Sequence, residues 1–445
     1  MTKLPPVALM STLLLHSFSL AQVDTSAAVR VGELEGKVDG MNGSLPEVNN
    51  IVDALRKIKV SGYLLAQYRY TDLINQPFPI GNFSGGKFAA NTKGHFQIRE
   101  GRLKVKYDNT LTQAVFQIDI LPTGVFVKDA YLSLTEPWLQ SFGLQMGVFD
   151  RPFGYEISFS SSSRESAERS RLFQTLFPGE RDLGAKVFYA PQFGALRLLR
   201  FDLGVFNGTG ANADEFDNFK DIIGHAAVQV PSKSPIALGL GVSGYFGNVR
   251  SNSSDIYLNG EPAPGVEGFV KQTDASNVGK GMTRRYVGGD AQFYYDVPSI
   301  GGLILRGEYI AGRQPGTSST TVSPSSQPTT PLYNRQFAGW YINLVQNIGD
   351  REQVVLKYDV YDPNTNVGAS DFTTASGLTV ADIRYGTFGF GLIHHWDANI
   401  KFLLYYELIK NEKLDLANIP TTSALFPYTN DVRDNVFTFR LQYKF

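Results

Sequence analysis

The sequence contains no cysteine, and this absence excludes disulfides, thiolate metal sites, a catalytic thiol and a lipid-attached cysteine. It also lacks an excess of either charge, because its formal net charge is −1, so no nucleic-acid-binding surface is expected. After residue 21, no apolar run approaches the length of a membrane-spanning helix. If the mature chain enters a membrane, it must therefore do so as strands.

Aromatic residues and glycine are abundant instead. The 445 residues include 31 Phe, 22 Tyr and 44 Gly, and this composition favours β structure over helical bundles. The chain begins with Lys3, an apolar stretch over residues 7–20 and the small residues Ser19 and Ala21. This order is typical of an export signal, so we predict a signal peptide over residues 1–21 that is cleaved after Ala21.

Residues 22–58 form a leader that differs from the rest of the chain. Apolar residues recur there at alternating spacings of three and four, which is a coiled-coil pattern; they are Val31, Leu34, Val38, Met41, Leu45, Val48, Val52 and Leu55. Several glycines and Pro46 interrupt the pattern, and each lowers helix stability. Two interpretations of this periplasmic leader stay open, a short coiled coil and a flexible segment.

From residue 59 the apolar residues follow a period of two, which predicts strands. Sixteen such runs follow one another, at 59–71, 95–107, 111–120, 125–136, 142–149, 182–190, 195–206, 222–230, 236–246, 285–297, 302–311, 337–347, 353–361, 383–395, 399–409 and 436–445. Most have the length, about nine to eleven residues, that a tilted strand needs to cross a bilayer.

The last run shows this alternation most clearly. One side of it carries Phe437, Phe439, Leu441, Tyr443 and Phe445, and the residues between them are polar or charged. In a membrane barrel the aromatic side faces lipid and the polar side faces a watery lumen. We interpret this run as the closing strand, and its ending resembles the signal by which barrel-assembly machinery accepts its clients.

The gaps between the runs alternate between short and long. Every gap after an even-numbered run is short, whereas seven of the eight gaps after odd-numbered runs are long and only 121–124 departs from the rule. Short turns at one end and long loops at the other are typical of outer-membrane barrels. An even number of strands also allows antiparallel closure without open edges. The sequence therefore predicts an all-β, 16-stranded antiparallel transmembrane β-barrel over residues 59–445.

One long gap, residues 150–181, is the candidate for narrowing the lumen, since a barrel of sixteen strands leaves an aqueous channel. Ser162 and Glu165 have the spacing of a capping box, which predicts the start of a short helix. The gap also offers apolar anchors at 172–173 and 176–177. We predict that this loop folds into the barrel and forms the constriction, with Arg151, Arg164, Glu168, Arg169 and Arg171 as its charged members; an external plug or lid is the alternative.

A basic ladder is predicted on the second run. The apolar positions change parity near Glu100 and Gly101, which indicates a β-bulge. With that bulge, four cationic side chains face the lumen, namely Arg99, Arg102, Lys104 and Lys106. Such ladders are how pores favour anions and phosphate. Carboxylates that also project inward by parity are Asp119, Asp129 and Glu308, and a field between a basic and an acidic wall fits a general diffusion pore equally well.

Other motifs carry little weight. Residues 239–244 spell G-x-G-x-x-G, but they lie inside a predicted strand with no following helix, so the dinucleotide interpretation fails on context. His394 and His395 point to opposite faces of a strand and cannot chelate one ion together. We expect no cofactor, no metal site and no enzymatic activity.

Six strings along the chain resemble the phosphate-selective porin O/P family when taken in order. They are "IREGRLKVKY", "VKDAYLSL", "GVFDRPFG", "LFPGERDLGAKVFY", "LRGEYI" and "VVLKYDVYDP". The resemblance covers residues 59–445. It implies a sixteen-stranded outer-membrane porin of Gram-negative bacteria, often trimeric, that passes anions.

The expected function is a water-filled channel for passive diffusion of small hydrophilic solutes, with general or weakly anion-selective passage placed before true phosphate specificity. The expected partners are outer-membrane lipid, the barrel-assembly machinery, small anions or polar solutes and two further copies of the chain in a homotrimer. Two other functions stay open. One is a surface receptor or adhesin that uses the loops 247–284 and 312–336, whose composition is typical of mobile external loops. The other is a lipid hydrolase, for which His95 and His225 are the candidate histidines.

Overall fold

The computed structural model describes residues 29–30, 32–34, 36–37, 49–72, 88, 91–230 and 235–445. The chain divides into two units, Met1–Lys57 and Ile58–Phe445. The predicted signal peptide lies outside the described residues. In the first unit the described residues up to 56 are helical, and Leu34 and Leu55 are each 60% exposed. The coiled coil of the leader stays a prediction.

The second unit is a barrel whose strands each pair with the next along the chain, apart from one external hairpin. The sixteen barrel strands of the described part are β1 (Ile58–Thr71), β2 (Gly94–Asn109), β3 (Thr112–Leu121), β4 (Gly124–Thr135), β5 (Phe142–Asp150), β6 (Arg181–Tyr189), β7 (Leu199–Phe206), β8 (Asp221–Val230), β9 (Ile236–Arg250), β12 (Gly281–Val297), β13 (Gly301–Gly316), β14 (Leu332–Ile348), β15 (Glu352–Asp362), β16 (Tyr385–His395), β17 (Ile400–Asn411) and β18 (Val436–Lys444).

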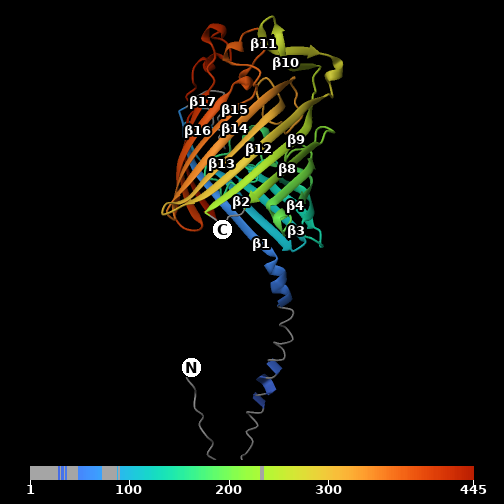
Figure 1. Ribbon diagram of the computed structural model, residues 1–445, viewed down its shortest axis with the longest axis vertical. Helices are drawn as coiled ribbons and strands as arrows, with labels where there is room; N and C mark the ends of the chain where they lie inside the picture. Colours follow the sequence, from blue (N-terminus) through green and yellow to red (C-terminus); the bar gives the residue numbers. More distant parts are fainter. Residues whose placement is uncertain are drawn as a thin grey trace, which may run out of the picture. The chain divides into compact units, whose positions relative to one another are not determined.

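Antiparallel pairing of the first and last strands closes the barrel. Tyr63 of β1 lies opposite Lys444 of β18, and the register runs on to Thr71 opposite Val436. Closure removes the unpaired strand edges that would otherwise expose backbone N–H and C=O groups. Figure 1 shows the tilted strands that wrap around this barrel. The predicted fold class is confirmed, and each of the sixteen predicted runs overlaps one barrel strand.

The barrel wall has an apolar outer face and a polar inner face, as the alternation in β18 illustrates. Phe439, Leu441 and Tyr443 are 38%, 40% and 47% exposed on the outside, whereas Arg440 and Gln442 between them are only 3% and 4% exposed. Successive residues of a strand point to opposite faces, so this difference follows directly from the sequence pattern. The polar residues are covered because other segments fill this side of the lumen.

The connections differ between the two ends of the barrel. At one end, the fully described connections are short, at 110–111, 136–141, 190–198, 298–300, 349–351 and 396–399. At the other end, the fully described connections are the tight turn 122–123 and six long segments. The long segments are 151–180, 207–220, 251–280, 317–331, 363–384 and 412–435. We call these the short-turn end and the long-loop end, and the predicted asymmetry is confirmed.

A hairpin at the long-loop end corrects the expectation that residues 247–284 form a mobile loop. Strands β10 (Asp255–Ala263) and β11 (Val266–Thr273) pair with each other, and β10 also pairs in parallel with β14. The ring of Tyr257 stacks on that of Tyr333 with centroids 4.2 Å apart and an interplanar angle of 2°. Figure 1 shows both strands beyond the barrel wall. Burial of aromatic side chains outweighs the loop-like composition of this segment.

Short helical elements complete the structure. They are α3 (Arg171–Leu176) and the 3₁₀ turns η1 (Ala195–Leu198), η2 (Ala275–Asn277), η3 (Ala369–Asp371), η4 (Val380–Asp382), η5 (Leu416–Asn418) and η6 (Phe426–Thr429). The turn η1 occupies the first four residues of the run predicted as a strand at 195–206, so β7 begins only at Leu199. Among the described helices, none combines the length and apolar character needed to cross a bilayer.

Candidate functional site

The connection between β5 and β6 folds into the barrel, and we call residues 151–180 the constriction loop. Its apolar anchors are fully buried, with Leu172 and Leu176 at 0% and Phe173 and Phe177 at 1% exposure. They pack in one cluster with inward-facing aromatic residues of the wall, which include Tyr286 and those of β14 and β15. The prediction that this loop is anchored inside the barrel is confirmed.

The helix of the constriction loop begins later than the capping-box pattern predicted. It starts at Arg171, whereas residues 161–163 form a turn. The barrel wall binds the Ser162 carbonyl, which would accept the first hydrogen bond of such a helix, and the Glu165 carboxylate, which would complete the capping box. The carbonyl oxygen of Ser162 accepts hydrogen bonds from Lys401 and Gln442 at 3.2 and 2.8 Å, and the Glu165 carboxylate pairs with Arg306 at 2.8 Å. Tertiary contacts thus override the local capping preference.

Glu168 connects the constriction loop to both sides of the barrel seam. Its carboxylate accepts two hydrogen bonds from the Arg99 guanidinium of β2, both at 2.9 Å, and one from Arg440 of β18 at 2.9 Å. Burial raises the pKa of Glu168, but Arg99 and Arg440 outweigh burial and hold the pKa far below its usual range. The carboxylate is therefore ionised and links these two strands through the loop.

Two further carboxylates hold the opposite part of the loop. Glu156 of the loop pairs with Lys357 of β15 at 2.7 Å. Glu308 of β13 accepts hydrogen bonds from the backbone N–H groups of Tyr155 and Glu156 at 2.9 and 2.5 Å and from the Tyr341 hydroxyl at 2.6 Å. Buried polar groups are thus satisfied across this contact, which fixes the path of the loop.

An open cavity of about 450 Å³ remains between the constriction loop and the inner faces of β2 to β8 and β12. Its wall carries seven basic and four acidic side chains besides one histidine; they are Arg102, Lys104, Arg151, Arg169, Arg181, Lys186, Arg200, Asp129, Asp150, Asp202, Asp290 and His225. Two carboxylates outside this lining also pair with its cations, since Glu100 contacts Arg102 and Glu180 contacts both Arg169 and Arg181. We call this cavity the eyelet.

The predicted bulge in β2 is present. Leu65 of β1 lies opposite Glu100 and Ala66 lies opposite Ile98, so Arg99 is the extra residue. Two members of the basic ladder line the eyelet, and the other two do not. Arg102 pairs with Glu100 at 3.2 Å and lines the eyelet together with Lys104. Outside the eyelet lining, Arg99 is bound by Glu168, and the last member of the ladder, Lys106, pairs with Asp108 at 2.9 Å.

The three predicted acidic residues do not form one wall. Asp119 lies beside the ladder, where it contacts Arg102 at 3.7 Å and accepts a hydrogen bond from the Gly101 N–H group at 2.9 Å. Asp129 is also on the ladder side, and it pairs with Arg181 at 3.1 Å. Glu308 is buried under the constriction loop. The expected field between opposing basic and acidic walls is therefore not built from these residues.

The loop cations have mainly internal contacts. Arg151 and Arg169 line the eyelet, and Arg169 pairs with Glu180 at 2.6 Å. Arg164 is 4% exposed, with the Glu168 carboxylate 3.8 Å away, and burial together with Arg169 lowers the pKa of Arg164 to about 10. The fifth charged member, Arg171, lies with its guanidinium carbon 4.0 Å from the ring centroid of Tyr385.

The cations on the far side of the eyelet were not among the residues predicted from the sequence. Lys186 of β6 and Arg200 of β7 both pair with Asp202, at 2.9 and 2.8 Å. His225 of β8 lies 2.9 Å from the Asp290 carboxylate of β12. The signal was available, because each of these residues is a polar side chain between apolar neighbours within a predicted strand. The path of the constriction loop decides which inward-facing charged residues it leaves open to the lumen.

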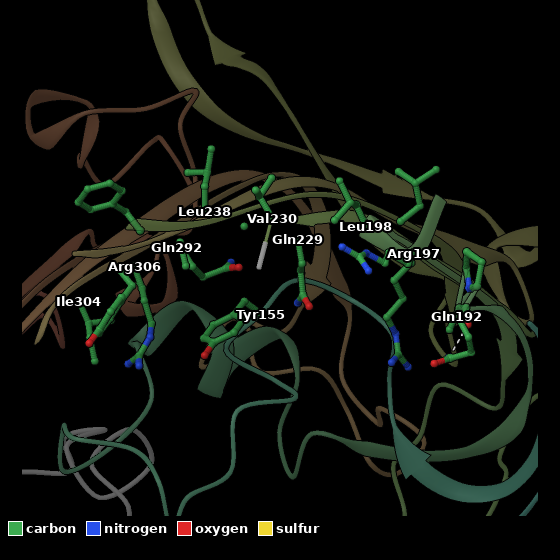
Figure 2. Close-up of a pocket in the computed structure, with 18 residues that line it drawn as sticks. Tyr155, Gln192, Arg197, Leu198, Gln229, Val230, Leu238, Gln292, Ile304 and Arg306 are labelled. Atoms are coloured by element: carbon green, nitrogen blue, oxygen red, sulfur yellow. Dashed lines mark hydrogen bonds between the residues drawn. The ribbon is translucent and has the colours of Figure 1, made fainter. Parts of the chain in front are cut away.

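A second cavity, of about 700 Å³, opens toward the short-turn end. Figure 2 shows Tyr155, Gln229, Gln292 and Arg306 on one side of the barrel wall, and Val230 and Leu238 on the other. Four residues line both this cavity and the eyelet, namely Tyr155, Arg200, Gln229 and Gln292. The two cavities therefore meet at these side chains.

Comparisons with known proteins agree on the fold. No family model matches the chain, and no curated protein matches it. Among solved structures, OprB of Pseudomonas putida is similar with a TM-score of 0.56 at 10% identity, over 88% of this chain and 96% of that one. A loop-deletion mutant of OmpT, an outer membrane protein of Vibrio cholerae, has a TM-score of 0.50 at 10% identity, over 87% and 99%.

An anion-selective porin from Comamonas acidovorans has a TM-score of 0.49 at 12% identity, over 87% of this chain and 99% of that one. At these identities a likeness reports on the course of the backbone only. The chain has a closed antiparallel barrel fold like that of OprB and of the outer membrane protein OmpT.

Proposed function

We propose that the protein is an outer-membrane porin that lets small hydrophilic solutes diffuse through its barrel. The single observation that carries this proposal is the constriction loop, which is bound inside a closed barrel and leaves a charged eyelet beside it. A loop held by ion pairs across a polar lumen fits a size- and charge-selective passage. The apolar outer face fits a lipid environment.

We further propose a preference for anions. Seven basic against four acidic side chains line the eyelet, and two of the basic ones belong to the predicted ladder. Phosphate specificity, which the resemblance to the phosphate-selective porin family implies, is a narrower form of this proposal. Its support is the presence of five guanidinium groups at the eyelet, because a guanidinium can bind two phosphate oxygens at once; they belong to Arg102, Arg151, Arg169, Arg181 and Arg200.

The cellular setting follows the same proposal. Cleavage after Ala21 would release the mature chain, and assembly machinery would recognise the C-terminal aromatic residues of β18. The short-turn end would face the periplasm and the long-loop end the exterior, as in other barrels. A homotrimer is proposed on the resemblance alone.

Conductance in a planar lipid bilayer tests the proposal. The purified protein is expected to give stepwise conductance, and its reversal potential in a potassium chloride gradient should indicate anion preference. The Lys104→Glu variant should shift that potential toward cations, because Lys104 lines the eyelet and is 35% exposed. Lys271→Glu makes the same charge change on the external hairpin and should leave the potential unaltered.

Folded protein without stepwise conductance would contradict the channel and favour a surface receptor. Enzymatic activity has less support from the structure. The proposed hydrolase needs a histidine on the lipid-facing rim, whereas His225 faces the lumen beside Asp290. His95 contacts Gln97 at 3.2 Å and the ring of Phe88.

A further inference from the structure

Two aromatic rings of the constriction loop form a stacked pair that faces the lumen. The ring centroids of Tyr155 and Phe159 are 5.4 Å apart with an interplanar angle of 26°, and both residues line the eyelet. Both are only partly buried, in contrast with Phe153 and Phe173 of the same loop, which are 1% exposed. These two rings therefore do not serve as buried anchors of the loop.

Arg306 of β13 packs against both rings of this aromatic pair. The guanidinium carbon of Arg306 lies 4.5 Å from the ring centroid of Phe159 and 5.8 Å from that of Tyr155. The same guanidinium is neutralised by Glu165 at 2.8 Å. A cation held against aromatic faces stabilises them in place, so the pair is preorganised and does not have to be ordered by a solute.

A positive charge remains in the same passage. Lys186 and Arg200 share the single carboxylate of Asp202, so this group of three carries one net positive charge. The Arg200 side chain is 52% exposed and can approach a solute. Gln292 donates its amide N–H to Asp290 at 2.7 Å, which leaves its amide oxygen as an acceptor.

The location places these groups on the route of any solute. Tyr155, Arg200 and Gln292 line both the eyelet and the second cavity, so a molecule that moves between the two cavities passes them. Figure 2 shows Tyr155, Gln292 and Arg306 extending on the same side of the wall. An aromatic ring, a cation and an amide group thus all line the junction of the two cavities.

We propose that this point is a binding subsite for planar organic monoanions, in which an aromatic ring stacks on Tyr155 and Phe159 and its carboxylate pairs with Arg200 or Lys186. A small inorganic anion satisfies the cation alone, and a neutral ring satisfies the aromatic pair alone. A ring that carries one carboxylate satisfies both and gains a charge-assisted hydrogen bond besides the stacking. This inference rests on the proposed channel function.

Block of the chloride current by benzoate in a planar bilayer tests the subsite. Three probes separate its parts: acetate has the charge without a ring, cyclohexanecarboxylate has a ring that is not planar, and benzyl alcohol has the planar ring without the charge. Benzoate is expected to reduce the current at concentrations about three- to tenfold lower than each of the three, which is the range that aromatic stacking supports.

Variants locate the effect. Tyr155→Leu and Phe159→Leu should each raise the blocking concentration of benzoate about threefold or more, because each removes one ring of the pair. Tyr131→Leu is the matched control, since Tyr131 lines the eyelet from β4 and should keep the benzoate block of the unaltered protein.

The outcomes separate this proposal from the channel itself. Loss of all conductance in the unaltered protein would contradict the channel function. Stepwise conductance with equal block by benzoate and acetate would overturn the subsite while the channel stands. Equal block by benzoate and cyclohexanecarboxylate, or equal loss of block in the Tyr131→Leu control, would also overturn it.

Discussion

The two sides of the barrel interior use the same kind of residue differently. On the side of β13 to β18, inward charges such as Glu308, Lys357 and Arg440 are bound to the constriction loop. On the side of β3 to β8, inward charges such as Lys186 and Arg200 face the eyelet. Alternation along a strand decides which residues point inward, but the path of one loop decides which of them a solute meets.

The largest expected effect is on the occupied side. Glu168→Ala leaves the guanidinium group of Arg440 buried without its carboxylate and removes the main partner of the partly exposed Arg99, which costs on the order of 3–5 kcal/mol for the docked loop. We expect the constriction loop to leave its position and the single-channel conductance to rise. Glu215→Ala removes an external carboxylate that pairs with Lys220 and serves as the control. Unaltered conductance of folded Glu168→Ala protein would contradict the role of this contact.

A smaller effect is expected on the open side. Lys186→Gln or Arg200→Gln removes one of the two cations that share Asp202. Loss of one charge near the passage raises the energy of an anion and lowers that of a cation by about 0.5 kcal/mol each, so the anion-to-cation permeability ratio should fall about fivefold. The ratio is measured from reversal potentials in a salt gradient. Arg197→Gln, at the short-turn end beyond the eyelet, should change the ratio less, and an equal change would argue against the eyelet as the selective point.

The smallest effect concerns the long loops, which pack on one another outside the passage. Burial raises the pKa of Asp434 to about 6, although Arg171 opposes the shift. Because the pKa is higher in the folded state than in the unfolded chain, folding favours the protonated acid. The protonated acid therefore stabilises this loop at low pH, and this contribution is lost as the pH rises through 6. Hydrogen exchange of residues 412–435, corrected for the intrinsic rate, should be slower at pH 5 than at pH 7.

The Asp434→Asn variant should remove this dependence on pH, because an amide does not titrate. A protection pattern that is the same in the variant and the unaltered protein would show that another group causes the effect.

Much of the fold could be predicted from the sequence because a barrel repeats one rule. Period-two alternation located all sixteen strands, and the parity change near Glu100 and Gly101 indicated the bulge, which the structure places at Arg99. The closing strand was evident from its aromatic residues. These features depend on neighbours two residues apart in the chain, so local pattern carries them.

The functional details depended on contacts between distant segments. The helix of the constriction loop starts at Arg171 because Lys401 and Arg306 bind the segment that a local cap would use. The β10–β11 hairpin forms because Tyr257 finds a partner in β14, although its loop composition suggested mobility. Lys186 and Arg200 could not be identified as eyelet residues from the sequence, because this depends on the path of the constriction loop. The strand pattern does not encode that path.

The absence of cysteine offers the most direct test, because a single introduced thiol can be addressed alone. Gln145 of β5 and Gln442 of β18 both point inward, but Gln145 lines the eyelet whereas Gln442 is bound to Ser162 of the constriction loop. A charged thiol reagent should reduce the current through Gln145→Cys protein and leave that through Gln442→Cys protein unaltered. Equal reduction in both variants would contradict a passage confined to one side of the barrel.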